Sequence, residues 1–185
     1  MKKTLMALAL AASLPLAAQA ADKPLSYTYI EGNYVNLDNG VDGVGVRGSY
    51  DFGDSGVYGL GSYGWLGGDD ELLDDDEVKS HELGLGYHHG ISDRADLIGE
   101  VAYRSAKTDA FRIDGARASV GLRGAMNDKF EGYAKANYYD ASDFDGDVTA
   151  TLGGQFKFNQ QWGVTAETEL GNGDQAYMVG VRASF

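Results

Sequence analysis

The sequence predicts an all-β fold, an antiparallel up-and-down transmembrane β-barrel of ten strands, with eight strands as the runner-up. Apolar residues recur at every second position, which is typical of strands. No apolar run after residue 20 approaches the ~20 residues that a membrane helix needs. Short connections alternate with longer acidic ones, as in barrels whose turns are short at one end only.

Residues 1–20 have the pattern of a secretory signal peptide and are excluded from the fold. Lys2 and Lys3 precede an apolar stretch at 5–16, and Ala-Gln-Ala at 18–20 is a small-residue cleavage site. The stretch is too short to span a bilayer. We therefore expect an exported protein whose barrel domain is 21–185, located in the bacterial outer membrane.

Ten segments are expected to be strands. The segments 25–36 and 43–52 alternate weakly, and 57–66 has no clear face because glycines fall in both registers. The clearest is 116–126, in which Val120 and Leu122 alternate with Ser119 and Arg123. The other predicted strands are 78–88, 95–106, 130–139, 148–158, 164–170 and 177–185.

The connections between these strands are of two kinds. Four are short turns, and five are mostly longer: short at 53–56, 89–94, 127–129 and 159–161; longer at 37–42, 67–77, 107–114, 140–147 and 171–174. The longer set holds 16 acidic residues and only Lys107 and Arg112 as bases, in a chain of net charge −13. An up-and-down barrel would therefore carry nearly all its net charge at its extracellular end.

Charged residues in the strands occupy the register opposite the apolar one. A charge that faces lipid at mid-depth costs roughly 2–4 kcal/mol, so these side chains are expected inside the barrel. The thirteen candidates for this lumen network, seven basic and six acidic, are Glu31, Arg47, Glu82, Glu100, Arg104, Arg117, Arg123, Glu131, Lys135, Lys157, Glu167, Glu169 and Arg182.

Aromatic residues of the apolar register fall near both ends of the strands, as in the interfacial girdles of membrane barrels. They are Tyr50, Phe52, Tyr87, Phe130, Phe156, Phe158, Trp162 and Phe185 at the short turns and Tyr34, Tyr103, Tyr138 and Tyr177 at the long loops. The alternatives are a water-soluble barrel or sandwich with an aromatic core, and a soluble exported barrel that holds an apolar ligand. The charged inner register argues against such a ligand pocket, which is mainly apolar.

The ending YMVGVRASF, with Tyr177, Val179, Val181, Ala183 and Phe185 in alternation, resembles the carboxy-terminal signal read by the barrel-assembly machinery. The size and signal peptide resemble small outer-membrane barrels of the OmpA/OmpX kind. The stretch LSYTYIEGNYVNLD resembles the xanthomonad barrels named for activating receptor-mediated immunity in rice. This resemblance implies a cell-surface protein with a host receptor as partner.

Ten strands would make a lumen slightly wider than the side-chain-filled interior of an eight-stranded barrel. Seven bases and six acids can pair across it, so the sequence favours a plugged lumen and a structural or surface-interaction protein. A narrow channel or small-solute transporter is the alternative. Expected partners are outer-membrane lipid and lipopolysaccharide, without nucleic acid, because no basic cluster is present.

The acidic connections suggest a second site. Hard divalent cations take oxygen ligands, so calcium or magnesium could bind weakly and bridge to lipopolysaccharide phosphates. The alternative is a solvated acidic surface without metal. The candidate ligands are Asp69, Asp70, Asp74, Asp75, Asp76, Asp143 and Asp145.

Catalysis is not expected, and neither is a cofactor. The chain has no cysteine nucleophile, and its three histidines are His81, His88 and His89. Adjacent strand residues point to opposite faces, so these histidines cannot form a local catalytic constellation.

Overall fold

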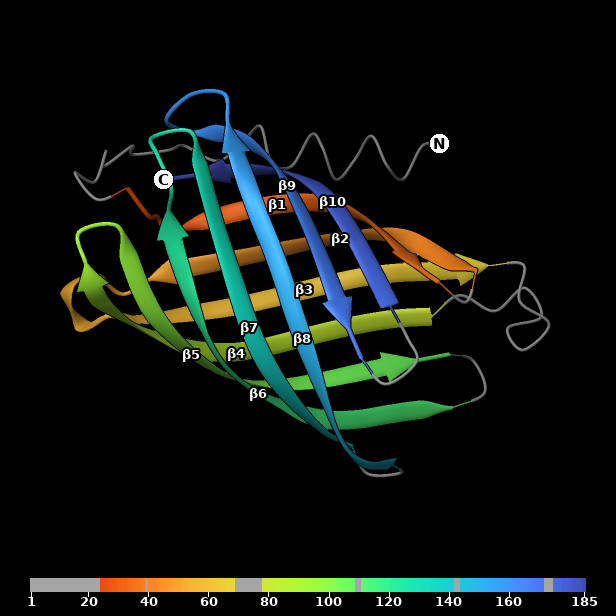
Figure 1. The fold of residues 1–185 in the computed structure, drawn as a ribbon. Coiled ribbons are helices and arrows are strands. Elements are labelled where there is room, and N and C mark those ends of the chain that lie inside the picture. Colours follow the sequence, from red (N-terminus) through yellow and green to blue (C-terminus); the bar gives the residue numbers. More distant parts are fainter. Residues whose placement is uncertain (1–23, 39, 69–77, 109–110, 142–143, 172–174) are drawn as a thin grey trace.

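The structure, a computed structural model, describes residues 24–185 except 39, 69–77, 109–110, 142–143 and 172–174. Ten antiparallel strands of the described chain form a closed barrel in which β1 pairs with β10 (Figure 1). The predicted ten-stranded barrel is confirmed, and the eight-stranded alternative is wrong. The strands are β1 (Tyr29–Leu37), β2 (Val41–Asp51), β3 (Val57–Gly68), β4 (Val78–Ser92), β5 (Ala95–Lys107), β6 (Arg112–Ala125), β7 (Phe130–Ala141), β8 (Phe144–Lys157), β9 (Trp162–Leu170) and β10 (Gln175–Ser184).

Several strands extend beyond their predicted ends into the acidic segments. β6 begins at Arg112 instead of 116, and β8 begins at Phe144 instead of 148. Arg112 pairs with Lys107, and Phe144 pairs with Ala141. The hydrogen bonds between neighbouring strands join backbone groups and do not depend on the side chains. The strands therefore continue beyond the residues whose apolar alternation predicted them. The predicted connections 107–114 and 140–147 are therefore too long.

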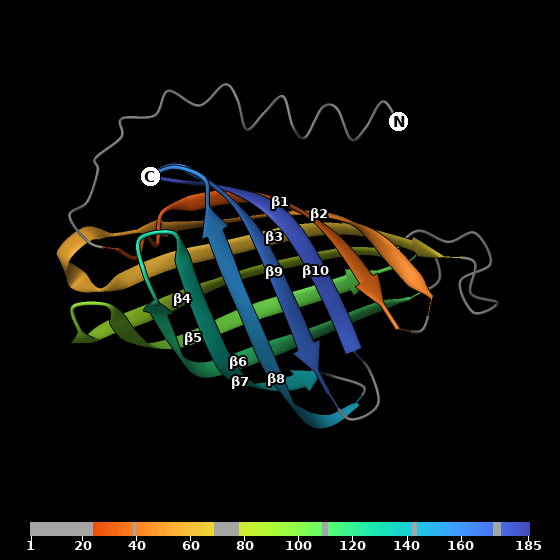
Figure 2. The same cartoon turned by 45° about the horizontal axis from the view of Figure 1, so that its top comes forward.

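The ends of the barrel differ in their connections. The turns between β2 and β3, β4 and β5, β6 and β7, and β8 and β9 gather at one end together with the C-terminus (Figures 1 and 2). The first of them is a 3-10 turn, Gly53–Ser55, closed by Gly56, whose φ of 71° lies in the left-handed region that favours glycine. We call this the turn end and the opposite one the loop end.

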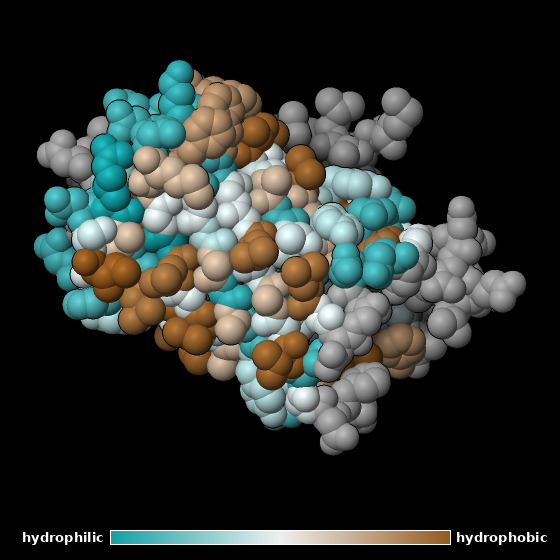
Figure 3. Space-filling view, in the orientation of Figure 1, coloured by the Kyte–Doolittle hydropathy of each residue, from teal (hydrophilic) through white to brown (hydrophobic). Residues whose placement is uncertain are grey.

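The apolar register of the strands lies on the outer face of the barrel wall and the charged register on its inner face. Val120 is 57% exposed on the outer face, and Leu152 and Val181 are exposed with it, whereas Arg123 is buried inside. Hydrophobic side chains gather over the middle of the wall in Figure 3, with hydrophilic ones toward the ends. A water-soluble barrel would bury these apolar side chains, so both soluble alternatives are wrong. Among the described residues there is no helix long and apolar enough to cross a membrane.

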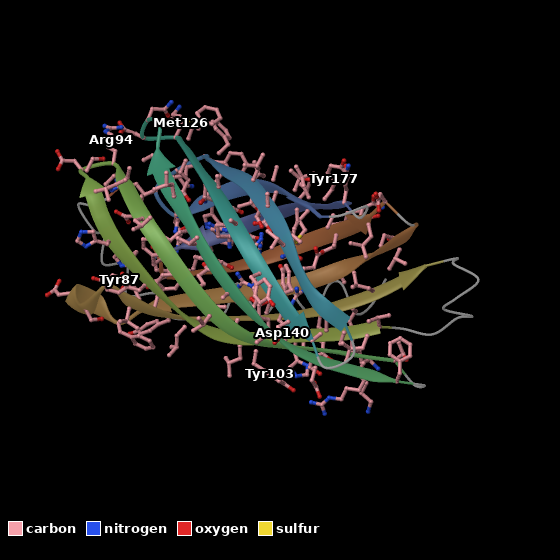
Figure 4. All side chains as sticks on the ribbon, turned by 60° about the horizontal axis from the view of Figure 1, so that its bottom comes forward. Tyr87, Arg94, Tyr103, Met126, Asp140 and Tyr177 are labelled. Carbon is pink, nitrogen blue, oxygen red and sulfur yellow. The ribbon has the colours of Figure 1, made fainter. Side chains whose placement is uncertain are left out.

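The aromatic residues of the outer register are exposed near both ends, except for Phe156 and Phe185, which are half-buried; two of those labelled in Figure 4, Tyr87 and Tyr103, lie toward opposite ends. Tyr63 and Trp65 of β3 add a pair of rings that are tilted by 59° to each other, with centroids 4.5 Å apart. The prediction omitted them because glycines in both registers concealed the face of this strand.

Candidate functional site: the charged lumen

The inner face holds a network of ion pairs, and each of the thirteen candidate charges contributes to it or lines the adjoining cavity. The charges come from nine of the ten strands, all except β3. No two sequence neighbours are involved, because alternate residues of a strand point to opposite faces. Barrel closure is therefore what assembles the network.

Glu31 is at the centre of the part nearer the turn end. Its side chain has no exposed area, and it accepts from Arg47 at 2.6 Å and from Arg182 at 2.8 Å. Glu131 plays the same part beside it, paired with Arg123 at 2.6 Å and with Lys157 at 3.2 Å. Arg182 also lies 3.8 Å from Glu131, so it links the two buried carboxylates.

A second group lies nearer the loop end. Glu100 accepts from Arg117 at 2.9 Å and from Lys135 at 3.2 Å. Glu82 pairs with Arg117 at 2.6 Å and with Arg104 at 3.2 Å. Arg117 therefore bridges two carboxylates, the converse of the arrangement around Glu31.

Glu167 joins the lumen network through Arg47. The guanidinium of Arg47 lies 3.1 Å from Glu167 while it also binds Glu31. The phenol of Tyr133 donates to the same carboxylate. Glu169 accepts from Thr149 at 2.8 Å nearer the loop end.

The residues that precede β1 do not continue the wall. Residues 24–28, here called the plug segment, enter the barrel at the turn end, where Leu25 and Tyr27 are buried against Tyr58, Ile98 and Ala125. The sequence analysis assigned 25–36 to one strand, which is wrong for its first four residues. The physical reason is that the apolar cluster inside the barrel mouth buries more of the Leu25 and Tyr27 side chains than an extension of β1 would.

Two polar contacts hold the plug segment. Lys157 donates to the carbonyl oxygen of Pro24 at 2.8 Å, and Ser26 donates to that of Phe185 at 2.7 Å. The second contact ties the start of the described chain to its last residue.

Tyr27 is the most connected side chain of the plug segment. Its ring stacks on His88 with centroids 4.1 Å apart, and the guanidinium of Arg123 lies 4.7 Å above it. Its phenol donates to Asp96 at 2.9 Å. Burial raises the pKa of Tyr27, which further favours the protonated phenol that donates to Asp96. His88 also lies 3.3 Å from Asp51.

A cavity of about 330 Å³ occupies the loop-side half of the lumen. Its wall runs from Leu37 and Leu66, near the loop end, down to Tyr58. Charged side chains line it, namely Arg47, Glu82, Glu100, Arg104, Arg117, Lys135, Glu167 and Glu169. The cavity thus reaches from the loop end to Tyr58, which also packs with Leu25 and Tyr27 of the plug segment on the turn side.

Sequence reasoning missed the plug segment and the Asp51, His88 and Asp96 group around it. A signal was present, because Leu25 and Tyr27 share the inner register of Glu31 although both are apolar or aromatic.

The other predicted sites have different outcomes. Tyr177, Val179 and Val181 of the assembly motif are exposed on the outer face, while Ala183 is buried. Of the seven candidate metal ligands only Asp145, on β8, lies within the described residues. In the part of the chain that the structure describes, no group of three His, Asp or Glu could hold a metal ion.

Comparison with known proteins places this fold. Residues 6–175 match the family described as "Outer membrane protein beta-barrel domain". The chain belongs to this outer-membrane β-barrel family. Its location is accordingly the bacterial outer membrane. No curated protein sequence matches this outer-membrane barrel significantly.

Three solved structures illustrate the likeness in fold. The KdgM porin has a TM-score of 0.54 at 14% identity, with 85% of this chain and 99% of that chain covered. The NanC porin has 0.52 at 10%, covering 85% and 100%. An outer-membrane channel from Pseudomonas putida F1, described as COG4313, has 0.52 at 10%, covering 93% and 100%.

Proposed function

We propose that this outer-membrane barrel is a narrow channel for small charged solutes, constricted at the turn end by the plug segment. The observation that carries the proposal is the charge-lined cavity of about 330 Å³ on the loop side of the lumen. A lumen that served only as a salt-bridged core would be packed throughout, with few voids larger than a water molecule. The porin and channel structures of similar fold support the same proposal.

Both signs of charge line the proposed route. Arg104, Lys135, Glu82 and Glu169 all line the cavity, and ion pairs with Glu82 and Glu100 hold Arg104 and Lys135 in place. Such a lining would exchange part of the hydration shell of a small ion or zwitterion for fixed charges. Large solutes would not pass, because a ten-stranded lumen is far narrower than that of a 16-stranded porin.

A second candidate is a closed barrel that acts through its surface. It is favoured by the ion pairs of Glu31 with two cations and of Glu131 with three, which crowd the turn-side lumen with charged side chains. Its partner would be a host receptor that binds the acidic loop end, where divalent cations would also bind. The barrel-assembly machinery would insert it into the membrane. Neither candidate includes catalysis.

Planar-bilayer recordings on the wild type and on a plug variant, Leu25→Gly/Tyr27→Gly, distinguish the two candidates. The wild type should show small, reproducible single-channel steps, and the variant larger ones, because its changes empty the mouth without breaking any ladder hydrogen bond. Met126→Gly, at an exposed turn of the same end, is the matched control and should conduct like the wild type. Folded barrels without steps in either protein would support the closed barrel instead.

A further inference from the structure

A histidine lies between two carboxylates at the turn end of the lumen. Nε2 of His88 is 3.3 Å from Oδ2 of Asp51, and its Nδ1 is 3.7 Å from Oδ2 of Asp96. The three side chains come from β4, β2 and β5, and each is largely enclosed, with exposed fractions of 12% for His88, 26% for Asp51 and 15% for Asp96. We call these three residues the histidine group.

The geometry of the histidine group suits a protonated ring better than a neutral one. A neutral imidazole has one N–H donor and one acceptor nitrogen, whereas an ionised carboxylate can only accept. With a carboxylate beside each ring nitrogen, neutral His88 can donate toward one aspartate and turns its lone pair toward the other. A protonated ring donates toward both, and its positive charge attracts both carboxylates.

The histidine group is coupled to the plug segment through Tyr27. The ring of Tyr27 stacks on that of His88, with centroids 4.1 Å apart and planes 3° from parallel. A cation over the face of a tyrosine ring is attracted to it, so protonation of His88 would strengthen this stack. The phenol of Tyr27 donates to Oδ2 of Asp96, the same oxygen that faces His88. One proton on His88 therefore acts on the plug segment as well as on the two aspartates.

One other cation lies near the histidine group. The guanidinium of Arg123 is 4.7 Å above the ring of Tyr27, and it would repel a second positive charge on His88. Arg123 is already paired with Glu131 at 2.6 Å, so this carboxylate offsets much of its charge. The two aspartates are closer to the imidazole and have the opposite sign, so we expect their attraction to exceed the repulsion.

The remaining titratable neighbours of His88 do not oppose its protonation. The ring of Tyr58 on β3 lies 6.1 Å from that of His88, and its phenol donates to Glu100 at 2.9 Å. His89, the next residue of β4, points to the opposite face of the wall because adjacent strand residues alternate. Within the described part of the chain, the charges that His88 faces directly are thus the two aspartates.

We propose that His88 is a proton-operated latch, which binds the plug segment more tightly in acid than at neutral pH. Histidine is the side chain that ordinarily changes its charge between pH 5 and 8, while aspartate ordinarily stays ionised there. Loss of the proton would leave one aspartate facing a lone pair and weaken the stack on Tyr27. Release of the plug segment would then become easier as the pH rises. The latch concerns the plug segment alone, and only the claim that its release widens a conducting route rests on the proposed function.

The test follows the position of the plug segment without relying on conduction. The chain has no cysteine, so Pro24→Cys and Asp128→Cys introduce the only two thiols, one on the plug segment and one at the exposed turn between β6 and β7. Nitroxide labels on both thiols give a distance distribution by pulsed electron paramagnetic resonance, for barrels in phospholipid vesicles at pH 5 and at pH 8. Planar-bilayer recordings on the unlabelled protein are made at the same two pH values.

Four variants are compared in the labelled protein. His88→Gln removes the titrating ring, and His88→Phe keeps a ring for Tyr27 to stack on but cannot take up a proton. His89→Gln removes the exposed neighbouring histidine and is the matched control. Leu25→Ala weakens the apolar contacts of the plug segment and so brings its released form into the measurable range.

The ratio of released to bound plug segment should be about tenfold higher at pH 8 than at pH 5, in the wild type and in Leu25→Ala. A factor of ten corresponds to about 1.4 kcal/mol, near the lower end of what a hydrogen bond to a charged group contributes. His88→Gln and His88→Phe should give the same ratio at both pH values, whereas His89→Gln should respond like the wild type. Conductance should rise with pH in parallel with the released form.

Three results would overturn the latch. They are an unchanged ratio between pH 5 and pH 8 in both the wild type and Leu25→Ala, a released form that grows in acid, and a full pH response in His88→Gln. A plug segment that responds as expected in barrels without single-channel steps would support the latch and contradict the proposed channel. Single-channel steps together with a plug segment that ignores pH would contradict the latch alone.

Discussion

Glu31→Gln should lower the free energy of unfolding by about 3–5 kcal/mol, because it leaves the buried guanidinium of Arg182 with only Glu131, at 3.8 Å, and takes from Arg47 one of its two carboxylates. The side chain of Glu31 is fully buried between Arg47 and Arg182. Glutamine keeps the volume, so the cost is electrostatic and not a cavity. Urea unfolding of the protein in phospholipid vesicles, followed by tryptophan fluorescence, measures it.

The matched control is Asp128→Asn, which breaks an exposed pair with Arg94 at the turn end. Exposed ion pairs contribute about 0–1 kcal/mol, so this variant should unfold close to the wild type. If Glu31→Gln also cost less than about 1 kcal/mol, water would have to solvate both arginines, and the turn-side lumen would not be dry.

Val120→Arg should lower the free energy of unfolding in vesicles by about 2–4 kcal/mol, because it places a charge at mid-depth on the lipid face. Val120 is 57% exposed in the middle of β6. In a water-soluble barrel the same exposed side chain would tolerate arginine almost without cost. The unfolding midpoint in urea reports the difference.

Met126→Arg serves as its control, since Met126 is exposed at the turn that follows β6. A charge near the membrane interface costs about 0–1 kcal/mol. Similar losses in both variants would mean that lipid depth does not set the cost and that the assignment of the outer face is wrong.

The fold could be predicted because one periodicity decides it. In 116–126 every outer residue is apolar or small and every charge is inward, and a slip of one residue would place Arg123 in lipid. The energetic penalty for that slip is large, so the sequence preserves the pattern. β3 lacks charges, and glycine tolerates either face, so its orientation and its Tyr63 and Trp65 pair could not be predicted.

The sequence predicted which charged residues line the lumen, but not which of them form ion pairs. Inward charges follow from the register, yet the partners of Glu31 come from β2 and β10, and those of Glu100 come from β6 and β7. Which cation meets which carboxylate depends on strand stagger around the closed barrel, which sequence alternation does not report. The plug segment was missed for a related reason, because its burial depends on a mouth that exists only after closure.

The seam between β1 and β10 has a consequence for folding order. Tyr29 pairs with Ser184, so the backbone groups on one edge of β1 have no hydrogen-bond partners until β10 has folded beside it. Consecutive strands from β2 to β9 can form hairpins locally. Closure of the barrel pairs β1 with β10, which are far apart in the sequence, so we expect it to be slow and to come last. Since Ser26 is anchored to Phe185, the lumen would stay unsealed at that mouth throughout assembly and become occluded only in the final step.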